Sequence, residues 1–327
     1  MARFRIPNSA SLHTVRAFLD ASDRFALRGK RASLEFHPRW SHMEPVAMAM
    51  AAAWGLWCRR NGLDIDVVNL GRNAAYASRM HLFETIRVPF EVGIREREEA
   101  GRFLPVTQVR DREGLRQVIG DISALLHLQH DPEALAAVQY CISELLRNAL
   151  EHSGSPDGGV VCAHRFVGGR TPRVSIAVAD CGQGVRSHLS RAHAGAARND
   201  EIALGMAMQP GVTGALPGMY GTPDNAGAGL FITRCIAKGT GGYFFMASGD
   251  AAYRLGRSRT TEDELTLEVD AFSEKRSVRW TPRYGWMGTV VAVEVRTDRI
   301  ADYEGFFQWI LRRIPSRSSF RSRIRFT

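Results

Sequence analysis

The sequence predicts an α/β protein built from two units, a smaller one at residues 1–93 and a larger one at residues 103–300. Strand-like and helix-like segments alternate from the first residues onward, and 327 residues are enough for two domains, each with its own core. A charge-dense stretch at 94–102 separates the two units and is expected to be a solvated linker.

The first unit reads as strands separated by helices. Strand patterns lie near residue 4, at 32–38 and at 64–70, and helical patterns lie at 11–25, 43–61 and 73–86. Strands separated by helices of this length predict some parallel pairing. The apolar run Pro45–Cys58 is too short to span a bilayer and predicts a buried helix.

The second unit begins with a strand pattern at 103–109 and two helical patterns at 112–128 and 133–152. Asp131 and Pro132 are a typical cap and first-turn pair for the second helix. Further strands are predicted at 159–166, 173–179, 242–247 and 289–295, and a helix is predicted to end near 237. A charged segment at 254–285 has no clear pattern. The remaining residues, 301–327, read as a helix at 302–314 and an Arg-rich tail.

Three blocks of the second unit carry residue types suited to nucleotide chemistry. In the first, SELLRNALEHS (143–153), helical spacing places Glu144, Asn148 and His152 on one stripe. The Asn148 carbonyl oxygen suits a hard cation such as Mg²⁺, and Glu144 can deprotonate an attacking water or hydroxyl. An ordinary amphipathic helix with a solvated polar face is the alternative.

The second block, VSIAVADCGQGV (174–185), ends a strand at Asp180 and turns through Gly182 and Gly184. A carboxylate there can accept a hydrogen bond from an adenine amino group, although such turns are common. The third block, NAGAGLFITRCIA (225–237), opens a helix after a Gly-rich turn. The backbone amides of its residues 227–229 would face phosphates, and a plain helix turn is the alternative.

The order of these blocks resembles the N, G1 and G2 boxes of the GHKL ATPase superfamily, which includes histidine kinases, anti-sigma kinases, gyrase B and MutL. GTVVAVEV (288–295) resembles the strand that closes such domains. The resemblance implies a two-layer α/β sandwich of the Bergerat type over 103–300 that binds ATP and Mg²⁺. It implies a lid at 186–226, and the segment 254–285 is then a long insertion that could carry a partner surface.

The resemblance also implies a role for each matching residue. Glu144 would be the general base, Asn148 the Mg²⁺ ligand and Asp180 the adenine-binding carboxylate, supported by Thr289. Gly182 and Gly184 would shape the adenine site. The residues of the third block that would bind the cofactor are Gly227, Ala228, Gly229 and Leu230. Ala228 departs from an all-glycine turn, which is tolerable because its backbone does the binding.

Three histidines and the first unit carry further candidate roles, each with a structural alternative. His152 would either contact the nucleotide or pack at the helix end, and His127 and His130 lack a third partner for a metal. Residues 32–87 resemble the later half of a STAS domain, the fold of anti-sigma-factor antagonists. Ser41 lies near the phosphorylated position of such domains, but we expect it to be a helix N-cap and not a phosphoacceptor.

These features favour an ATPase or Ser/Thr-type protein kinase that acts as a signalling switch. An orthodox histidine kinase is disfavoured. Such a kinase needs an acceptor histidine in an H-box on a preceding helix, and His127, the only histidine in 112–128, lacks the flanking acidic residue and proline of that motif. A nucleotide-gated interaction module with little turnover is the main alternative. A nucleic-acid or anionic-surface binder that uses the basic tail is a weaker one, consistent with a net charge of +9. The expected partners are ATP and an unidentified protein, and a homodimer is left open. Five scattered cysteines and no signal-peptide pattern predict a cytoplasmic location.

Overall fold

The computed structural model describes residues 1–21, 23–27, 29–71, 74–89, 102–168, 171–213, 227–257 and 266–314. Most of the predicted linker, the end of the predicted lid, part of the predicted insertion and the basic tail lie outside these ranges. The N-terminal elements are β1 (Ala2–Ile6), β2 (Ser9–Ala10), α1 (Val15–Leu19), β3 (Arg31–Phe36), β4 (His42–Met43), α2 (Pro45–Arg60), β5 (Asp64–Val68), α3 (Ala74–Arg79) and α4 (Leu82–Thr85).

The elements from residue 102 onward follow the predicted order closely. The strands are β6 (Phe103–Val109), β7 (Gly159–Phe166), β8 (Arg173–Ala179), β9 (Phe244–Gly249), β10 (Ala251–Leu255), β11 (Ser277–Trp280) and β12 (Trp286–Arg296). The helices are α5 (Arg112–Leu125), α6 (Pro132–His152), α7 (Gly184–Leu189), α8 (Asp200–Ala207), α9 (Gly229–Gly239) and α10 (Tyr303–Leu311), with short 3₁₀ turns η2 (Ala194–Ala197), η4 (Ala271–Ser273) and η5 (Thr297–Arg299).

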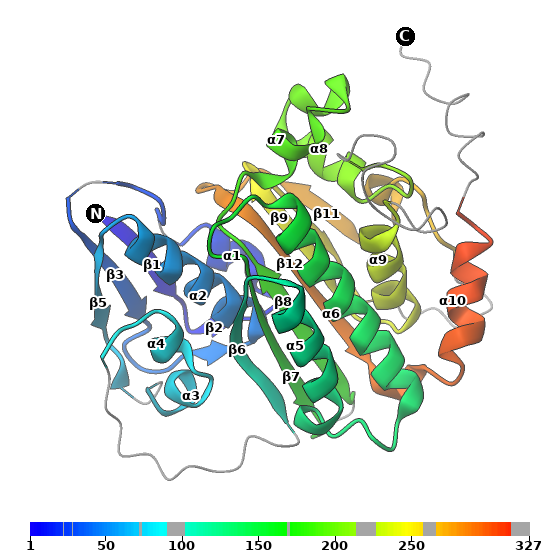
Figure 1. The fold of residues 1–327 in the computed structure, drawn as a ribbon, viewed down its shortest axis with the longest axis horizontal. Coiled ribbons are helices and arrows are strands. Elements are labelled where there is room, and N and C mark those ends of the chain that lie inside the picture. The colour runs from blue at the N-terminus through cyan, green and yellow to red at the C-terminus, as the bar shows by residue number, and fades with distance from the viewer. Residues whose placement is uncertain are drawn as a thin grey trace.

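The larger sheet has seven strands in the order β11-β10-β9-β12-β8-β7-β6, and its neighbouring strands pair antiparallel. Helices α5, α6 and α9 cover one face, while α2 packs against the other (Figure 1). Along β7, Val161 belongs to the core under α6 and its neighbour Cys162 to the core under α2. Burial on both faces explains why these strands read as continuous apolar runs.

The smaller sheet is parallel, in the order β1-β3-β5, which confirms the parallel pairing predicted for the first unit. Helix α2 lies between this sheet and the larger one, and every residue of Pro45–Cys58 is buried. Trp54 of α2 packs on Phe4 of β1, with ring centroids 5.3 Å apart. The buried helix predicted from the apolar run is confirmed, and its all-round hydrophobicity reflects its place between two sheets.

One core cluster joins the small unit to the back of the large sheet. It includes Phe4 and Trp54 together with Ala177 of β8 and Phe245 of β9. The small unit therefore has no separate core, which differs from the expectation of one core per unit. No helix within the described ranges is long and apolar enough to cross a membrane.

Three predicted segments differ in the structure. The helix expected at 11–25 is only α1, because the buried Arg24 guanidinium binds the carbonyls of Phe18 and Leu19 where that helix ends. The helix expected at 73–86 is broken by His81, which has a left-handed φ of 56°. The segment expected to be irregular at 254–285 contributes β11 and the end of β10 to the sheet edge.

Ser41 is not a helix N-cap, which corrects its expected role. Glu44 holds the N-cap position of α2, and Ser41 is buried before it. The Ser41 hydroxyl accepts a hydrogen bond from the His37 backbone N–H at 3.2 Å. This hydroxyl therefore fixes the loop between β3 and β4.

Candidate functional site

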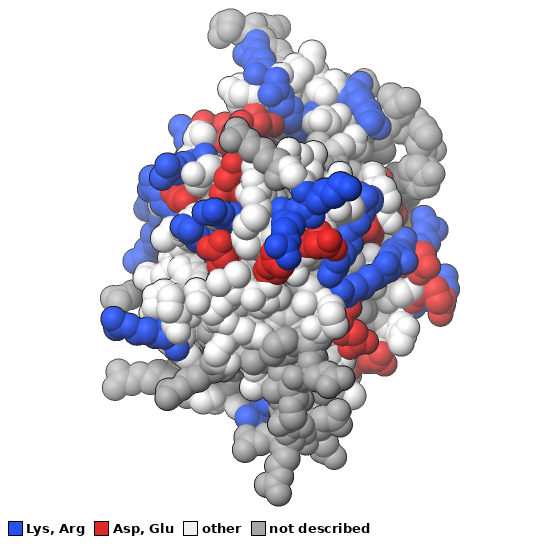
Figure 2. All heavy atoms as spheres, turned by 90° about the vertical axis from the view of Figure 1, so that its left-hand side faces the viewer, with Lys and Arg blue, Asp and Glu red and all other residues white. Residues whose placement is uncertain are grey.

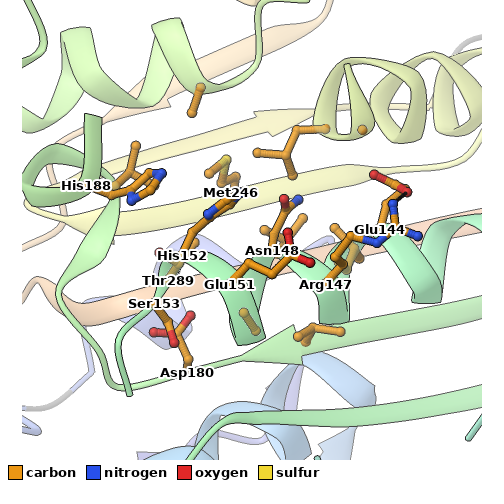
Figure 3. A pocket seen from close by; sticks show the side chains of 18 of the residues that line it. Glu144, Arg147, Asn148, Glu151, His152, Ser153, Asp180, His188, Met246 and Thr289 are labelled. Carbon is orange, nitrogen blue, oxygen red and sulfur yellow. Dashed lines mark hydrogen bonds and ion pairs between the residues drawn. The ribbon is translucent and has the colours of Figure 1, made fainter. Parts of the chain in front are cut away.

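A cavity opens between helix α6 and the central strands β8, β12 and β9, beneath α7 and the end of α8 (Figure 3). Ten residues are predicted for the nucleotide site, one as the catalytic base and nine as binding residues. Eight of them line the cavity, and they come from all the sequence blocks: Glu144, Asn148, Asp180, Gly184, Gly227, Gly229, Leu230 and Thr289. Gly182 and Ala228 do not line it. The fold thus brings together segments up to about 145 residues apart in the chain, from Glu144 to Thr289.

Helix α6 presents one polar face to the cavity because its opposite face is apolar. The helix begins as predicted, with the Asp131 side chain accepting a hydrogen bond from the Ala134 N–H at 3.1 Å. Val138, Ile142 and Leu146 are fully or almost fully buried under it. The remaining face carries the predicted stripe, and Arg147, Glu151 and Ser153 join that stripe along the cavity wall.

Asp180 lies at the end of β8 with only 4% of its surface exposed. Its Oδ1 accepts a hydrogen bond from the Gly182 N–H at 2.8 Å, and its backbone N–H donates to the Thr289 carbonyl at 2.9 Å. Burial raises the pKa of Asp180 to about 7, against the opposing effect of the backbone N–H groups of Gly182 and Thr289. A further hydrogen-bond donor in the cavity would therefore lower the pKa of this carboxyl and favour its ionised form.

Two glycines let the backbone pass close to Asp180. Gly288 has a φ of +87°, and a Cβ there would lie 2.6 Å from Asp180 Oδ1. A Cβ on Gly182 would overlap the Ser153 carbonyl at the end of α6. Gly182 thus acts behind the cavity by positioning Asp180, whereas Gly184 lines the cavity itself.

The predicted base, Glu144, lies at the opposite end of the cavity from Asp180 (Figure 3). Its Oε1 accepts an ion-paired hydrogen bond from Arg147 at 2.8 Å. Burial raises its pKa, Arg147 opposes that shift, and Glu151 adds to it. Its carboxylate also abuts Gly229 at the start of α9, where a side chain on that residue would overlap Glu144 Oε2.

The turn before α9 is built as the third block predicts, with one difference. Gly227 has a φ of +81° and a backbone that runs close to Val212. Ala228 is the N-cap residue of α9, and its side chain is buried in the core below the cavity. Ala228 is therefore a packing residue in this structure, while its glycine neighbours line the cavity.

The described part of the predicted lid, 186–213, is largely helical. It comprises most of α7, the turn η2 and α8, and these pack around a small core of Leu189, Ala196 and Ala203. Val185, Leu189, Ala207 and Val212 contribute an apolar wall to the cavity. The rest of the predicted lid, 214–226, lies outside the described residues.

Two histidines stack inside the cavity. The rings of His152 and His188 have centroids 4.4 Å apart and an interplanar angle of 28°. Burial lowers the pKa of His152 and lowers that of His188 to about 4, so the pair is neutral near pH 7. Within the described part of the chain, the buried His188 Nε2 has no hydrogen-bond partner. His152, predicted either to contact the nucleotide or to pack, lines the cavity and packs on His188.

Sequence reasoning missed Arg147, His188 and Met246. Arg147 could have been found, because it stands three residues after Glu144 and therefore on the same helix face. His188 and Met246 reach the cavity only through the path of α7 and the register of β9 against β12. Among the described residues, no three or more His, Cys, Asp or Glu side chains gather as a metal site.

No protein-family model matches this chain, and a search of curated proteins found no match either.

Proposed function

We propose that this cavity binds Mg-ATP and that the chain is an ATPase or Ser/Thr-type protein kinase of the GHKL type, acting as a cytoplasmic signalling switch. The observation that carries the proposal is the convergence of three separate sequence blocks on one cavity: the Glu144–Asn148 helix face, the buried Asp180 and the Gly227–Gly229 turn. The same proposal includes a Bergerat-type fold for the larger unit and a STAS-like fold for the first unit.

The residues fit a purine nucleotide. The buried Asp180 carboxyl is held by the Gly182 N–H, and it would accept a hydrogen bond from an exocyclic amino group of the ligand. Thr289 lies beside it, and its side chain is within 3.5 Å of the Ser248 hydroxyl. The His188 Nε2, which has no hydrogen-bond partner among the described residues, would offer a further polar contact beside the apolar side chains of the wall. These features support binding of the adenine ring at this end of the cavity.

The other end of the cavity fits a metal-bound phosphate chain. Mg-ATP supplies an electrophilic terminal phosphoryl group, so the protein must position a nucleophile and neutralise charge. Asn148 would ligate the cation through its side-chain oxygen, and phosphate and water oxygens would complete the set. Glu144 would accept the proton of the attacking water or hydroxyl, and burial raises its pKa toward the range suited to a base.

A nucleotide-gated interaction module is the second candidate, and the Glu144–Arg147 ion pair favours it. Arg147 lowers the pKa of Glu144 relative to the same buried carboxylate without the pair and occupies one of its oxygens, so binding without rapid turnover is consistent with this arrangement. In either case the small unit, packed behind the sheet, is suited to sense or transmit the state of the cavity.

The outer face of the small unit does not favour nucleic-acid binding. On the outer face of the small unit, basic and acidic side chains lie next to one another (Figure 2). Arg5 pairs with Glu35, Arg31 with Asp66 and Arg59 with Asp64. The basic tail at 315–327 lies outside the described residues.

A turnover assay with γ-labelled ATP tests the proposal. Free phosphate and labelled protein are scored separately, with and without Mg²⁺, and ATP binding is measured in parallel by titration. Free phosphate indicates an ATPase, labelled protein indicates a kinase, and saturable binding without either supports the interaction module. Absence of ATP binding would refute the proposal in every form.

A further inference from the structure

The cavity has an unusual charge balance for a phosphate site. Its described lining contains three carboxyl groups, from Glu144, Glu151 and Asp180, and a single Lys or Arg side chain, that of Arg147. These side chains together are net negative, so a polyphosphate entering the cavity would need its bound Mg²⁺ and Arg147 to offset the repulsion. Among the described Lys and Arg side chains, Arg147 is therefore the one that can contribute positive charge to an anion in this cavity.

Arg147 is placed to reach such an anion. Its side chain is 49% exposed at the cavity wall, so it can change partners without desolvation of a buried charge. Its Nη1 donates a hydrogen bond to Glu144 Oε1 at 2.8 Å, and its Nη2 donates to the Ser143 hydroxyl at 3.5 Å. Both partners come from the same two turns of α6, so no distant element holds the guanidinium in place.

The partner of Arg147 already occupies a position suited to a phosphate. The Glu144 carboxylate lies between the guanidinium and the backbone of Gly229, the first residue of the 11-residue helix α9. A helix start carries a partial positive charge and free N–H groups, which favour an anion there. In this structure the carboxylate of Glu144 lies beside this helix start.

We propose that Arg147 is a phosphate-binding residue, and that it exchanges Glu144 for the terminal phosphates of the bound nucleotide. This inference rests on the proposed function, since it assigns a subsite of the same cavity. The exchange would hold Glu144 paired when the cavity is empty and release it when phosphates arrive. Glu144 would thereby become available as a base only when phosphates occupy the cavity.

A second ion pair provides a matched control. Arg116 and Glu113 on α5 have the same three-residue spacing and the same 2.8 Å N–O distance. Both side chains are more than 70% exposed, and neither lines the cavity. Arg116→Ala therefore removes an equivalent charge and pair without touching the proposed subsite.

The test uses titrations of the full chain with Mg-ATP, adenosine and inorganic tripolyphosphate. For Arg147→Ala we expect affinity for ATP and tripolyphosphate to fall about 10- to 100-fold, the loss of a charge-assisted hydrogen bond, with adenosine affinity unchanged. Arg147→Lys should recover part of the loss, because it retains the charge without the guanidinium fork. Arg116→Ala should match the wild type for all three ligands.

A double variant separates direct contact from simple neutralisation of Glu144. In the Glu144→Gln background, Arg147→Ala should still weaken tripolyphosphate binding. If its effect vanishes there, Arg147 acts only by pairing Glu144, and the phosphate assignment is wrong. An equal loss for adenosine and tripolyphosphate would likewise show a structural role and overturn it.

The three ligands also separate this inference from the proposed function. Wild-type binding of ATP that Arg147→Ala leaves intact overturns the phosphate assignment alone. Binding of tripolyphosphate but neither ATP nor adenosine, lost in Arg147→Ala, supports the assignment while refuting the ATP site. If none of the three ligands binds the wild type, both proposals fall.

Discussion

Trp286 donates its indole N–H to the backbone carbonyl of Asp180 at 3.0 Å. Its ring packs edge-on against Phe25 of the small unit, with centroids 5.3 Å apart, and Phe25 packs in the same way on Trp57 of α2. One buried side chain thus touches both Asp180, at one end of the cavity, and the core that the small unit shares with the large sheet. Trp286 therefore links the small unit to Asp180, the residue on which adenine recognition is proposed to depend.

The first prediction uses this contact. Trp286→Phe keeps an aromatic ring but leaves the Asp180 carbonyl without its donor, so it should lower the free energy of unfolding by about 1–3 kcal/mol. It should also weaken nucleotide binding. Trp54→Phe is the control, because Trp54 is equally buried and donates to the Arg24 carbonyl at 2.7 Å, away from the cavity. Urea unfolding and ATP titration of both variants make the comparison. Equal effects on binding would show that the contact has no special link to the site.

The second prediction concerns the charge on Asp180. Its pKa is about 7 in the folded protein against an ordinary 3.8, so the folded state holds this proton more tightly than the unfolded state does. The carboxyl therefore lowers stability progressively as pH rises from about 4 to 7. Asp180→Asn should stabilise the nucleotide-free protein at pH 8 by an amount on the order of a few kcal/mol, and not at pH 4.

The same substitution should weaken ATP binding about 10- to 100-fold, because the amide cannot accept from the adenine amino group in the same way. Wild-type affinity should rise from pH 6 to pH 8 as Asp180 ionises, and the variant should show a flatter profile. Asp298→Asn is the control, because the pKa of Asp298 is shifted in the opposite direction. The hydrogen bond from Arg296 lowers the pKa of Asp298, so removing this carboxylate should not stabilise the protein at pH 8. Thermal melts and titrations at each pH decide both points.

The sequence allowed most of this site to be predicted, for a physical reason. The stripe on α6 and the turns after β8 and before α9 are local patterns, set by helical period and by glycine conformation. Their meeting in one cavity was inferred only through resemblance to a known order of motifs. The side chains of Met246 and His188 depend on strand register and helix path, which local patterns do not encode.

Parts of the fold escaped prediction for similar reasons. The early end of α1 depends on Arg24, a residue beyond the helix whose buried guanidinium binds the helix carbonyls. Strand β11 is half exposed and charged at the sheet edge, so it lacks the alternating pattern of an internal strand. The shared core behind the large sheet could not be inferred, because both sheets and α2 read as apolar whatever they pack against.

The third prediction tests the close backbone approach at Asp180. Gly288→Ala places a methyl group against the Asp180 carboxylate and forces a positive φ on alanine, so it should lower both stability and ATP affinity. Gly120→Ala on α5 is the matched change: nothing lies within 4 Å of its added Cβ, and it should stabilise the helix by about 0.5–1 kcal/mol. Thermal melts with and without ATP distinguish the two. A Gly288→Ala protein with unaltered melting and binding would contradict the proposed packing.

The fourth prediction follows from the shared core. Residues 102–327 expressed alone would expose the apolar face of the large sheet that shares a core with the small unit, including Cys162, Ala177 and Phe245. We expect this fragment to aggregate or to bind a hydrophobic dye, and to regain solubility when co-expressed with residues 1–89. Gel filtration of the separate and co-expressed fragments is the measurement. A soluble, monomeric fragment 102–327 with a cooperative melt would show that the large unit folds without the small one.

The last prediction separates chemistry from binding at the phosphate end. Glu144→Gln preserves the shape of the side chain but cannot take up a proton, so turnover should fall by roughly 10²–10⁴, the usual contribution of a positioned general base. ATP affinity should stay the same or rise, because a negative charge beside Gly229 has been removed. Asn148→Ala should instead damage both, since the proposed Mg²⁺ ligand serves binding and phosphoryl transfer alike.

Glu113→Gln is the control for these two variants, because Glu113 forms the equivalent helical ion pair outside the cavity, and it should leave both measurements unchanged. Single-turnover rates and ATP titrations on the variants make the test, with Mg²⁺ varied for Asn148→Ala. Loss of the Mg²⁺ dependence of binding in that variant would support its role as a ligand. If Glu144→Gln abolishes ATP binding while Asn148→Ala binds and turns over normally, the two residues do not have the proposed roles, and the helix face they share would then be only one wall of the cavity.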